Sequence, residues 1–117
     1  MKVLRVACAG VAMIAAASIL LAADSRTYDA PIERAWDEAV KATRDAGLDV
    51  TDSDRSEHWF RMQTPKKTLA KTVFFEVRLT RTGDRTTVSV RSTDHEGSKK
   101  SAKVIARYLG ALDERMN

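Results

Sequence analysis

The clearest pattern in this 117-residue chain is an alternation over Thr72–Arg81, in which every second side chain from Val73 to Leu79 is apolar and the others are polar except for Phe74. The apolar members recur at every second position, which places them on one side of an extended strand: Val73, Phe75, Val77 and Leu79. The segment Thr82–Arg85 has the composition of a tight hairpin turn, and Thr86–Ser92 then repeats the alternation with two valines. Because the apolar side of such a hairpin must be covered, the sequence predicts an antiparallel sheet with one buried and one solvated face.

Two segments carry the three- and four-residue apolar spacing of amphipathic helices. The first begins at Ala30-Pro31, where proline is favoured, and ends at Gly47, where glycine is favoured. Its apolar side is predicted to contain Ile32, Ala35, Trp36, Ala39, Val40 and Thr43. The second helix covers Ser98–Met116, and its apolar side is predicted to contain Ala102, Ile105, Tyr108, Leu109, Leu112 and Met116.

Three shorter strands complete the expected fold: Ser25–Asp29, Leu48–Thr51 and His58–Thr64. A polar turn is expected at Asp52–Ser56. The resulting order is β-α-β-β-β-β-α, and its short connections favour an antiparallel meander. The sequence therefore predicts an α+β two-layer sandwich, formed by the single domain 24–117, in which both helices cover one face of the sheet.

Residues 1–23 have the composition of a secretory signal, because two basic residues near the start precede the uncharged run Val6–Ala23. Two alternatives remain open. Cleavage would release residues 24–117 into the periplasm or outside the cell, whereas retention would leave the uncharged run as an inner-membrane anchor. Both alternatives keep the positive start inside and export the domain.

Removal of the leader would change the chemistry of the chain as well as its location. It would remove Cys8, the only cysteine, so the exported domain is expected to be stable without a disulfide. The remaining charges are unevenly distributed. Asp24–Glu57 holds five basic and ten acidic residues, whereas His58–Asn117 holds 13 basic and six acidic residues. This asymmetry predicts a dipolar surface.

No pattern in the sequence indicates an enzyme, a metal site or a cofactor. The segment Asp52–Ser56 resembles the start of a calcium loop, but Glu57 stands where that loop requires glycine. His95 lies in a polar turn, and His58, expected at the surface, is not at ligand spacing from it. Because a nucleophile elbow and a phosphate-binding glycine loop are also absent, we expect no catalytic residue, metal or cofactor.

The strand parity places aromatic and arginine side chains together on the solvated face: Trp59, Arg61, Phe74, Arg78 and Arg91. Such groups suit stacking and cation–π contacts with a glycan, a peptide or an anionic partner. Export argues against nucleic acid as that partner. The alternative is that Trp59 packs over the end of the sheet, because a one-residue shift in register exchanges the two faces.

Two lysine clusters are candidates for contact with an anionic surface. The first contains Lys66, Lys67 and Lys71, and the second contains Lys99, Lys100 and Lys103. Either cluster is suited to anionic lipid head groups or to an acidic polysaccharide. The alternative for both is a solvated charged surface without a partner.

Three segments resemble small bacterial envelope domains of unknown function: Tyr28–Trp36, Ala46–Val50 and the threonine-rich hairpin Thr82–Val90. The arrangement is similar to the helix-grip domains of the BamC-type lipoprotein of outer-membrane β-barrel assembly. This resemblance implies non-enzymatic binding in the cell envelope and transfers no catalytic residue. Many of those relatives carry a lipobox, which this sequence lacks.

These observations lead to two functional hypotheses. The first is a non-catalytic periplasmic binding or envelope-assembly accessory module, whose partner is an envelope protein, a peptide or a glycan. The alternative is a small-ligand carrier or a small hydrolase with a cavity between sheet and helices. That cavity would be lined by Trp36, Phe75 and Tyr108.

Overall fold

The computed structural model describes residues 24–66, 71–93 and 99–117, which form five strands and two helices. In chain order these are β1 (Asp24–Tyr28), α2 (Ile32–Asp45), β2 (Asp49–Asp54), β3 (Trp59–Gln63), β4 (Phe74–Thr82), β5 (Arg85–Ser92) and α3 (Lys99–Met116). The predicted leader, Lys67 and His95 lie outside the described residues.

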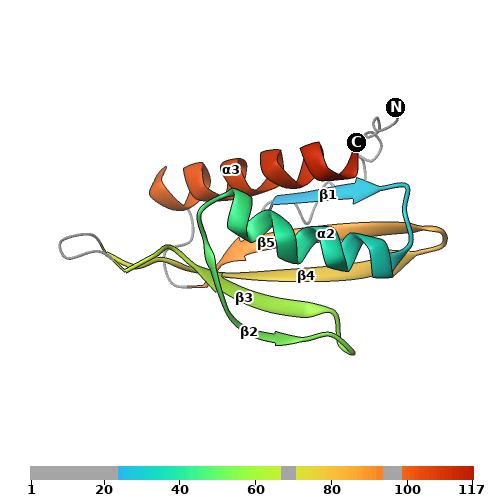
Figure 1. The fold of residues 1–117 in the computed structure, drawn as a ribbon, viewed down its shortest axis with the longest axis horizontal. Helices are drawn as coiled ribbons and strands as arrows, with labels where there is room; N and C mark the ends of the chain where they lie inside the picture. Colours follow the sequence, from blue (N-terminus) through green and yellow to red (C-terminus); the bar gives the residue numbers. More distant parts are fainter. Residues whose placement is uncertain (1–23, 67–70, 94–98) are drawn as a thin grey trace.

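The strands form one antiparallel sheet in the order β1-β5-β4-β3-β2. Both helices lie on the same side of this sheet (Figure 1), where α2 contacts β4 and β5 and α3 contacts β1 and β5. The predicted α+β class, with two layers and an antiparallel sheet, is therefore confirmed. Neither described helix is long and apolar enough to cross a membrane.

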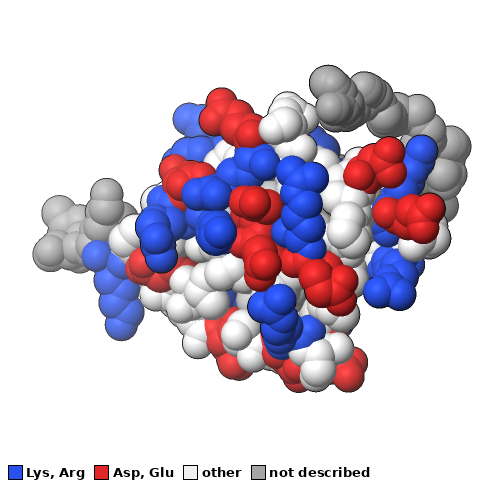
Figure 2. Space-filling view, turned by 45° about the vertical axis from the view of Figure 1, so that its right-hand side comes forward, with Lys and Arg blue, Asp and Glu red and all other residues white. Residues whose placement is uncertain are grey.

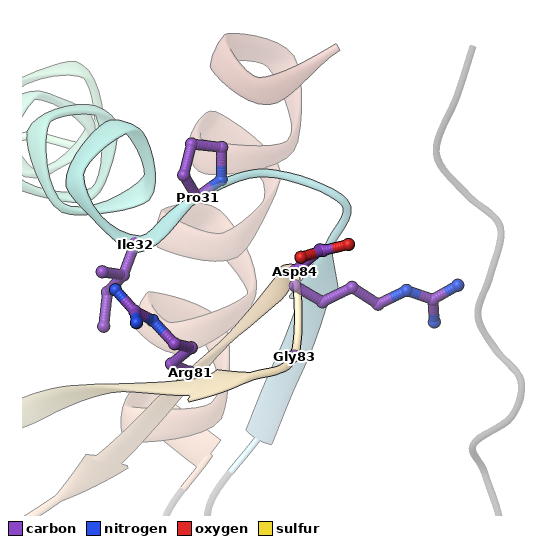
Figure 3. A pocket seen from close by; sticks show the side chains of 6 residues that line it. Pro31, Ile32, Arg81, Gly83 and Asp84 are labelled. Carbon is purple, nitrogen blue, oxygen red and sulfur yellow. The ribbon is translucent and has the colours of Figure 1, made fainter.

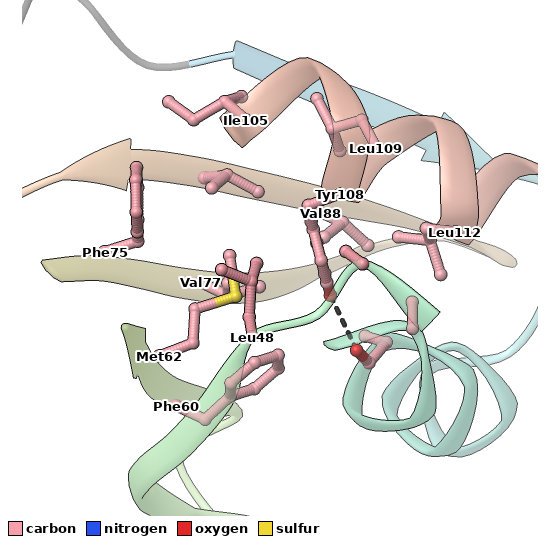
Figure 4. Packing of buried hydrophobic residues seen from close by; sticks show 14 of the residues in the cluster. Leu48, Phe60, Met62, Phe75, Val77, Val88, Ile105, Tyr108, Leu109 and Leu112 are labelled. Carbon is pink, nitrogen blue, oxygen red and sulfur yellow. Dashed lines mark hydrogen bonds between the residues drawn. The ribbon is translucent and has the colours of Figure 1, made fainter. Parts of the chain in front are cut away.

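The alternating residues of β4 and β5 form the core under the helices. Phe75 and Val77 are fully buried, and Val77 lies directly opposite Val90. Tyr108 of α3 is also fully buried, and its hydroxyl donates a hydrogen bond of 2.7 Å to the carbonyl oxygen of Ala39 in α2 (Figure 4). Because that hydroxyl has a partner, its burial does not leave an unsatisfied polar group.

The limits of α2 follow the sequence signals. Pro31 occupies the position before the first helical residue in an extended conformation, and Gly47 follows the helix with φ of +75°. That φ lies in the left-handed region, which glycine adopts at little cost. Trp36 is 5% exposed, and its ring meets that of Phe60 edge-on at a centroid distance of 5.6 Å. The prediction that Trp36 belongs to the core is confirmed.

The predicted turn at Asp52–Ser56 is wrong in its position. Strand β2 continues to Asp54, and the turn occupies residues 55–58. The carboxylate of Asp54 accepts hydrogen bonds from the Ser56 hydroxyl at 2.7 Å and from the Glu57 amide at 3.1 Å. These bonds, the first above all, hold the pKa of Asp54 below its ordinary value. Asp54 thus ends the strand by closing the turn that follows.

A bulge at Thr51 explains why the acidic residues join the strand. The register moves from Val50 opposite Met62 to Asp52 opposite Arg61, so Thr51 is an extra residue. Without the bulge, Asp52 would be displaced to the helix-facing side of the sheet. With it, Asp52 faces the other side, where its Oδ2 lies 3.9 Å from Nη1 of Arg61. Attraction between opposite charges on neighbouring strands compensates for the low strand propensity of aspartate.

Two single-residue predictions are also wrong. His58 does not begin a strand at the surface; it ends the turn with φ of 59°, is half-buried and places its ring edge-on to Trp36 at 6.0 Å. In α3, Ala102 is exposed and Ser101 takes the buried position. The buried side tolerates this serine because its hydroxyl lies 3.3 Å from that of Ser92.

An arginine near the end of α3 joins the two helices. Nε of Arg115 lies 2.6 Å from Oδ2 of Asp45, and its Nη1 lies 3.1 Å from Oε1 of Glu38. Lys and Arg side chains lie among Asp and Glu side chains over the face seen in Figure 2. The hydrogen bond from Arg115 is the main reason why the pKa of Asp45 lies below its ordinary value of 3.8.

We expect this contact to make stability depend on pH. Because the pKa of Asp45 is lower in the folded state than in the unfolded chain, its stabilising effect is present above about pH 4 and is lost as the pH falls through the folded-state pKa. Arg115→Gln should therefore be less stable than the wild type at neutral pH and approach it in acid. Urea unfolding across this range measures the difference. For the exposed control Arg34→Gln, the difference from the wild type in free energy of unfolding should not change with pH. A pH-independent difference for Arg115→Gln would contradict the prediction.

Candidate functional site

All five residues predicted for the solvated face lie on the outer face of the sheet, the side opposite the helices. Trp59 lies directly opposite Arg78, and the next row places Arg61, Glu76 and Arg91 opposite one another across β3, β4 and β5. Trp59 is half-buried, whereas the other predicted residues are exposed, Phe74 to 41%. The strand parity inferred from the sequence is therefore correct.

Glu76 lies at the centre of the outer face and was not among the predicted site residues. Its side chain is only 8% exposed, although it points away from the core. Its Oε2 accepts a hydrogen bond of 2.9 Å from Nε of Arg78, and its Oε1 lies 3.6 Å from Nη2 of Arg91. A buried carboxylate is costly unless it is paired, and here two guanidinium groups provide the pairing. The sequence did contain a signal for this contact, because Glu76 and Arg78 are two residues apart and therefore lie on the same face of the strand.

The contact with Glu76 fixes the orientation of Arg78. Nε and Nη2 of Arg78 both approach Oε2 of Glu76, at 2.9 and 2.8 Å. A guanidinium group carries five N–H donors, so this contact leaves the edge that includes Nη1 for other acceptors. The Arg78 side chain is 58% exposed. It is therefore both held in place and accessible, and a donor held in this way loses less entropy when it binds an acceptor.

A small hollow lies over this cluster and is lined by Glu76, Arg78, Ser89 and Arg91. Its volume is about 70 Å³, which corresponds to about two water molecules at liquid density. The hollow is bordered by two guanidinium groups and one carboxylate. It is therefore suited to a carboxylate, a phosphate oxygen or a carbonyl oxygen, with the Ser89 hydroxyl as a further hydrogen-bonding group.

Trp59 and Arg61 form a second part of the outer face. The Cζ atom of Arg61 lies 5.0 Å from the centroid of the Trp59 ring, which is a cation–π distance. Arg61 also lies beside Asp52 of β2, so the row Asp52, Arg61, Glu76 and Arg91 alternates in charge across four strands. This row thus begins with a carboxylate at β2 and ends with a guanidinium group at β5.

A second hollow lies at the β4–β5 turn, beside the start of α2 (Figure 3). It measures about 380 Å³ and is lined by Pro31, Ile32, Arg81, Gly83, Asp84 and Arg85. In Figure 3 the Arg81 side chain points toward Ile32, whereas Asp84 points away from the helix. This hollow contains none of the predicted site residues. Among the described residues, no group of three or more potential metal ligands is brought together.

The residues expected to line an internal cavity are packed into the core. Trp36 is 5% exposed, and Phe75 and Tyr108 are fully buried, in the packing shown in Figure 4. Neither of the two hollows described above is lined by these residues. The carrier or hydrolase hypothesis therefore has no support from the arrangement of this part of the core.

Comparisons with known proteins identify relatives in fold only. No family model matches the sequence, and no curated protein matches it. The structure is similar to CalU16 from Micromonospora echinospora, with a TM-score of 0.57 at 16% identity, over 78% of this chain and 68% of CalU16. It is also similar to a protein from Nitrosospira multiformis, with a TM-score of 0.57 at 12% identity, over 81% of this chain and 94% of that one. At these identities the likeness shows the α+β fold alone.

We predict a measurable coupling between Glu76 and Arg78. A double-mutant cycle with Glu76→Gln and Arg78→Gln should give a coupling free energy of about 1 kcal/mol in urea unfolding, because the carboxylate is nearly buried. The matched cycle on Asp52 and Arg61 should give a smaller value, because both side chains are more than half exposed and their closest atoms are 3.9 Å apart. Equal values in the two cycles would contradict a special role for Glu76.

Proposed function

We propose that this chain is a non-catalytic exported binding module of the bacterial envelope, periplasmic and accessory to envelope assembly, whose partner docks on the outer face. The observation that carries the proposal is the set of arginines held in place on an exposed sheet face, with Arg78 fixed by Glu76 and Arg61 against Trp59. The leader-like residues 1–23 and the resemblance of Tyr28–Trp36 to envelope domains support the location.

The chemistry of the outer face indicates what its partner must present. The hollow over Glu76 accepts one anionic or carbonyl group, and Trp59 and Phe74 offer apolar contact on either side of that row. Toward β1 the face carries hydroxyl groups, among them Thr27 and Thr87, whose oxygens are 2.9 Å apart. A peptide, a glycan or an envelope protein with an exposed acidic group has this combination of features.

The environment of Glu76 favours binding over catalysis. A general base must be able to reach a proton of the substrate. Both oxygens of Glu76 are instead engaged by Arg78 and Arg91, and the side chain is 8% exposed. This carboxylate therefore acts as an anchor for the arginines, which bind the partner.

Two substitutions on the outer face test this function. Trp59→Ala and Arg78→Ala should remain folded at the capture temperature, with Arg78→Ala unfolding at a lower temperature than the wild type because Glu76 loses one of its two guanidinium partners. Both variants should lose at least ten-fold in recovery of a partner from a solubilised envelope fraction. The measurement is affinity capture with the immobilised full chain, quantified by mass spectrometry. The control Arg34→Ala, at an exposed position of α2, should recover the partner at the wild-type level.

The capture experiment can contradict the proposal in two ways. Undiminished recovery by both outer-face variants would exclude this face as the binding surface. An equal loss with Arg34→Ala would show that capture depends on general charge and not on the outer face.

A further inference from the structure

Five exposed lysines at one end of the domain take no part in the outer face. Lys66 and Lys71 lie within the β3–β4 connection, and Lys99, Lys100 and Lys103 occupy the first turns of α3. Nζ of Lys100 donates a hydrogen bond of 2.8 Å to the carbonyl oxygen of Lys71. The two lysine clusters of the sequence therefore meet in space, and we call these five residues the lysine end.

The lysine end brings several positive charges together without a carboxylate between them among the described residues. Within the described residues, none of its five ammonium groups has a carboxylate partner. By contrast, Arg26, Arg78 and Arg115 each lie within ion-pair distance of a carboxylate. Five cations without an ion pair among the described residues are thus gathered at this end, which gives the described surface a positive potential there.

Helix electrostatics show that these lysines are not placed for stability. The first turn of a helix carries the positive end of its dipole and favours acidic residues. Helix α3 instead starts with Lys99 and Lys100 and has no acidic residue in its first turn. Violations of such local rules are expected where a surface serves a function.

The start of the described chain lies at the same end of the sheet. Asp24, the first residue of β1, is opposite Val90, which stands two residues before the end of β5 at Ser92. Strand β5 leads on to the start of α3, where Lys99 lies. Asp24 therefore lies toward the end of the sheet from which β5 leads to Lys99, and the uncharged run Val6–Ala23 precedes it in the sequence.

We propose that the lysine end docks on the anionic surface of a lipid bilayer, with its ammonium groups against lipid phosphates. Lysine is a compact, hydrated point charge that suits a diffuse array of head groups, whereas arginine suits fixed bidentate contacts. Each basic residue near such a surface contributes about five-fold in affinity. The lysine end shares no residue with the outer face, so this docking is independent of the partner proposed above.

The test is the binding of the full chain to vesicles of mixed phosphatidylglycerol and phosphatidylcholine, divided by its binding to vesicles of phosphatidylcholine alone. This ratio removes any contribution that residues 1–23 make equally to both. In the triple variant Lys66→Gln/Lys99→Gln/Lys103→Gln the ratio should fall about 100-fold. Its melting temperature should not fall, because the change relieves the unfavourable charge at the start of α3.

A matched control removes three charges elsewhere. Arg34→Gln/Lys41→Gln/Arg44→Gln alters exposed positions of α2 and should keep the ratio within about five-fold of the wild type. An unchanged ratio in the first variant, or an equal fall in the control, would overturn the proposal. Tighter binding to polygalacturonate than to the mixed vesicles, lost in the first variant, would also overturn it by assigning the lysine end to acidic polysaccharide.

Discussion

The pairing of β4 with β5 is the contact on which the rest of the structure depends. Val77 and Val90 face each other at its centre, and the alternation on both strands gives the sheet one apolar side that water must not reach. Both helices pack on that side, so no described helix covers the other. The exposed outer face is therefore a direct result of how the core is buried, and its side chains are available for other contacts.

Periodicity accounts for most of what the sequence could predict. The alternation in β4 and β5 and the helical spacing around Trp36 determined the fold class and the side on which Arg78 lies. The bulge at Thr51 could not be predicted from the sequence because its cause is non-local: Asp52 must meet Arg61 across the sheet. The choice of Ser101 over Ala102 depends in the same way on a hydroxyl partner in β5. Hydrophobicity alone cannot identify such positions, because the compensating group is distant in sequence.

Glu76 shows how stability and binding can depend on one contact. Its carboxylate is tolerated on the outer face only because Arg78 and Arg91 cover it. The same two hydrogen-bonding and ionic contacts hold the arginines above the hollow before any partner arrives. These long side chains thus lose conformational entropy during folding, so less conformational entropy remains to be lost when a partner binds. The sequence shows Glu76 at an alternate position between Phe75 and Val77, which predicts a solvated side chain and does not reveal this burial.

The bulge in β2 has a consequence for how copies of the domain behave toward one another. Strand β2 is an edge of the sheet, and an edge strand offers backbone groups that can pair with another chain. The bulge interrupts the regular spacing of those groups, and Asp49, Asp52 and Asp54 would bring like charges together if two such edges met. The strand is thereby protected against edge-to-edge aggregation at high local protein concentration.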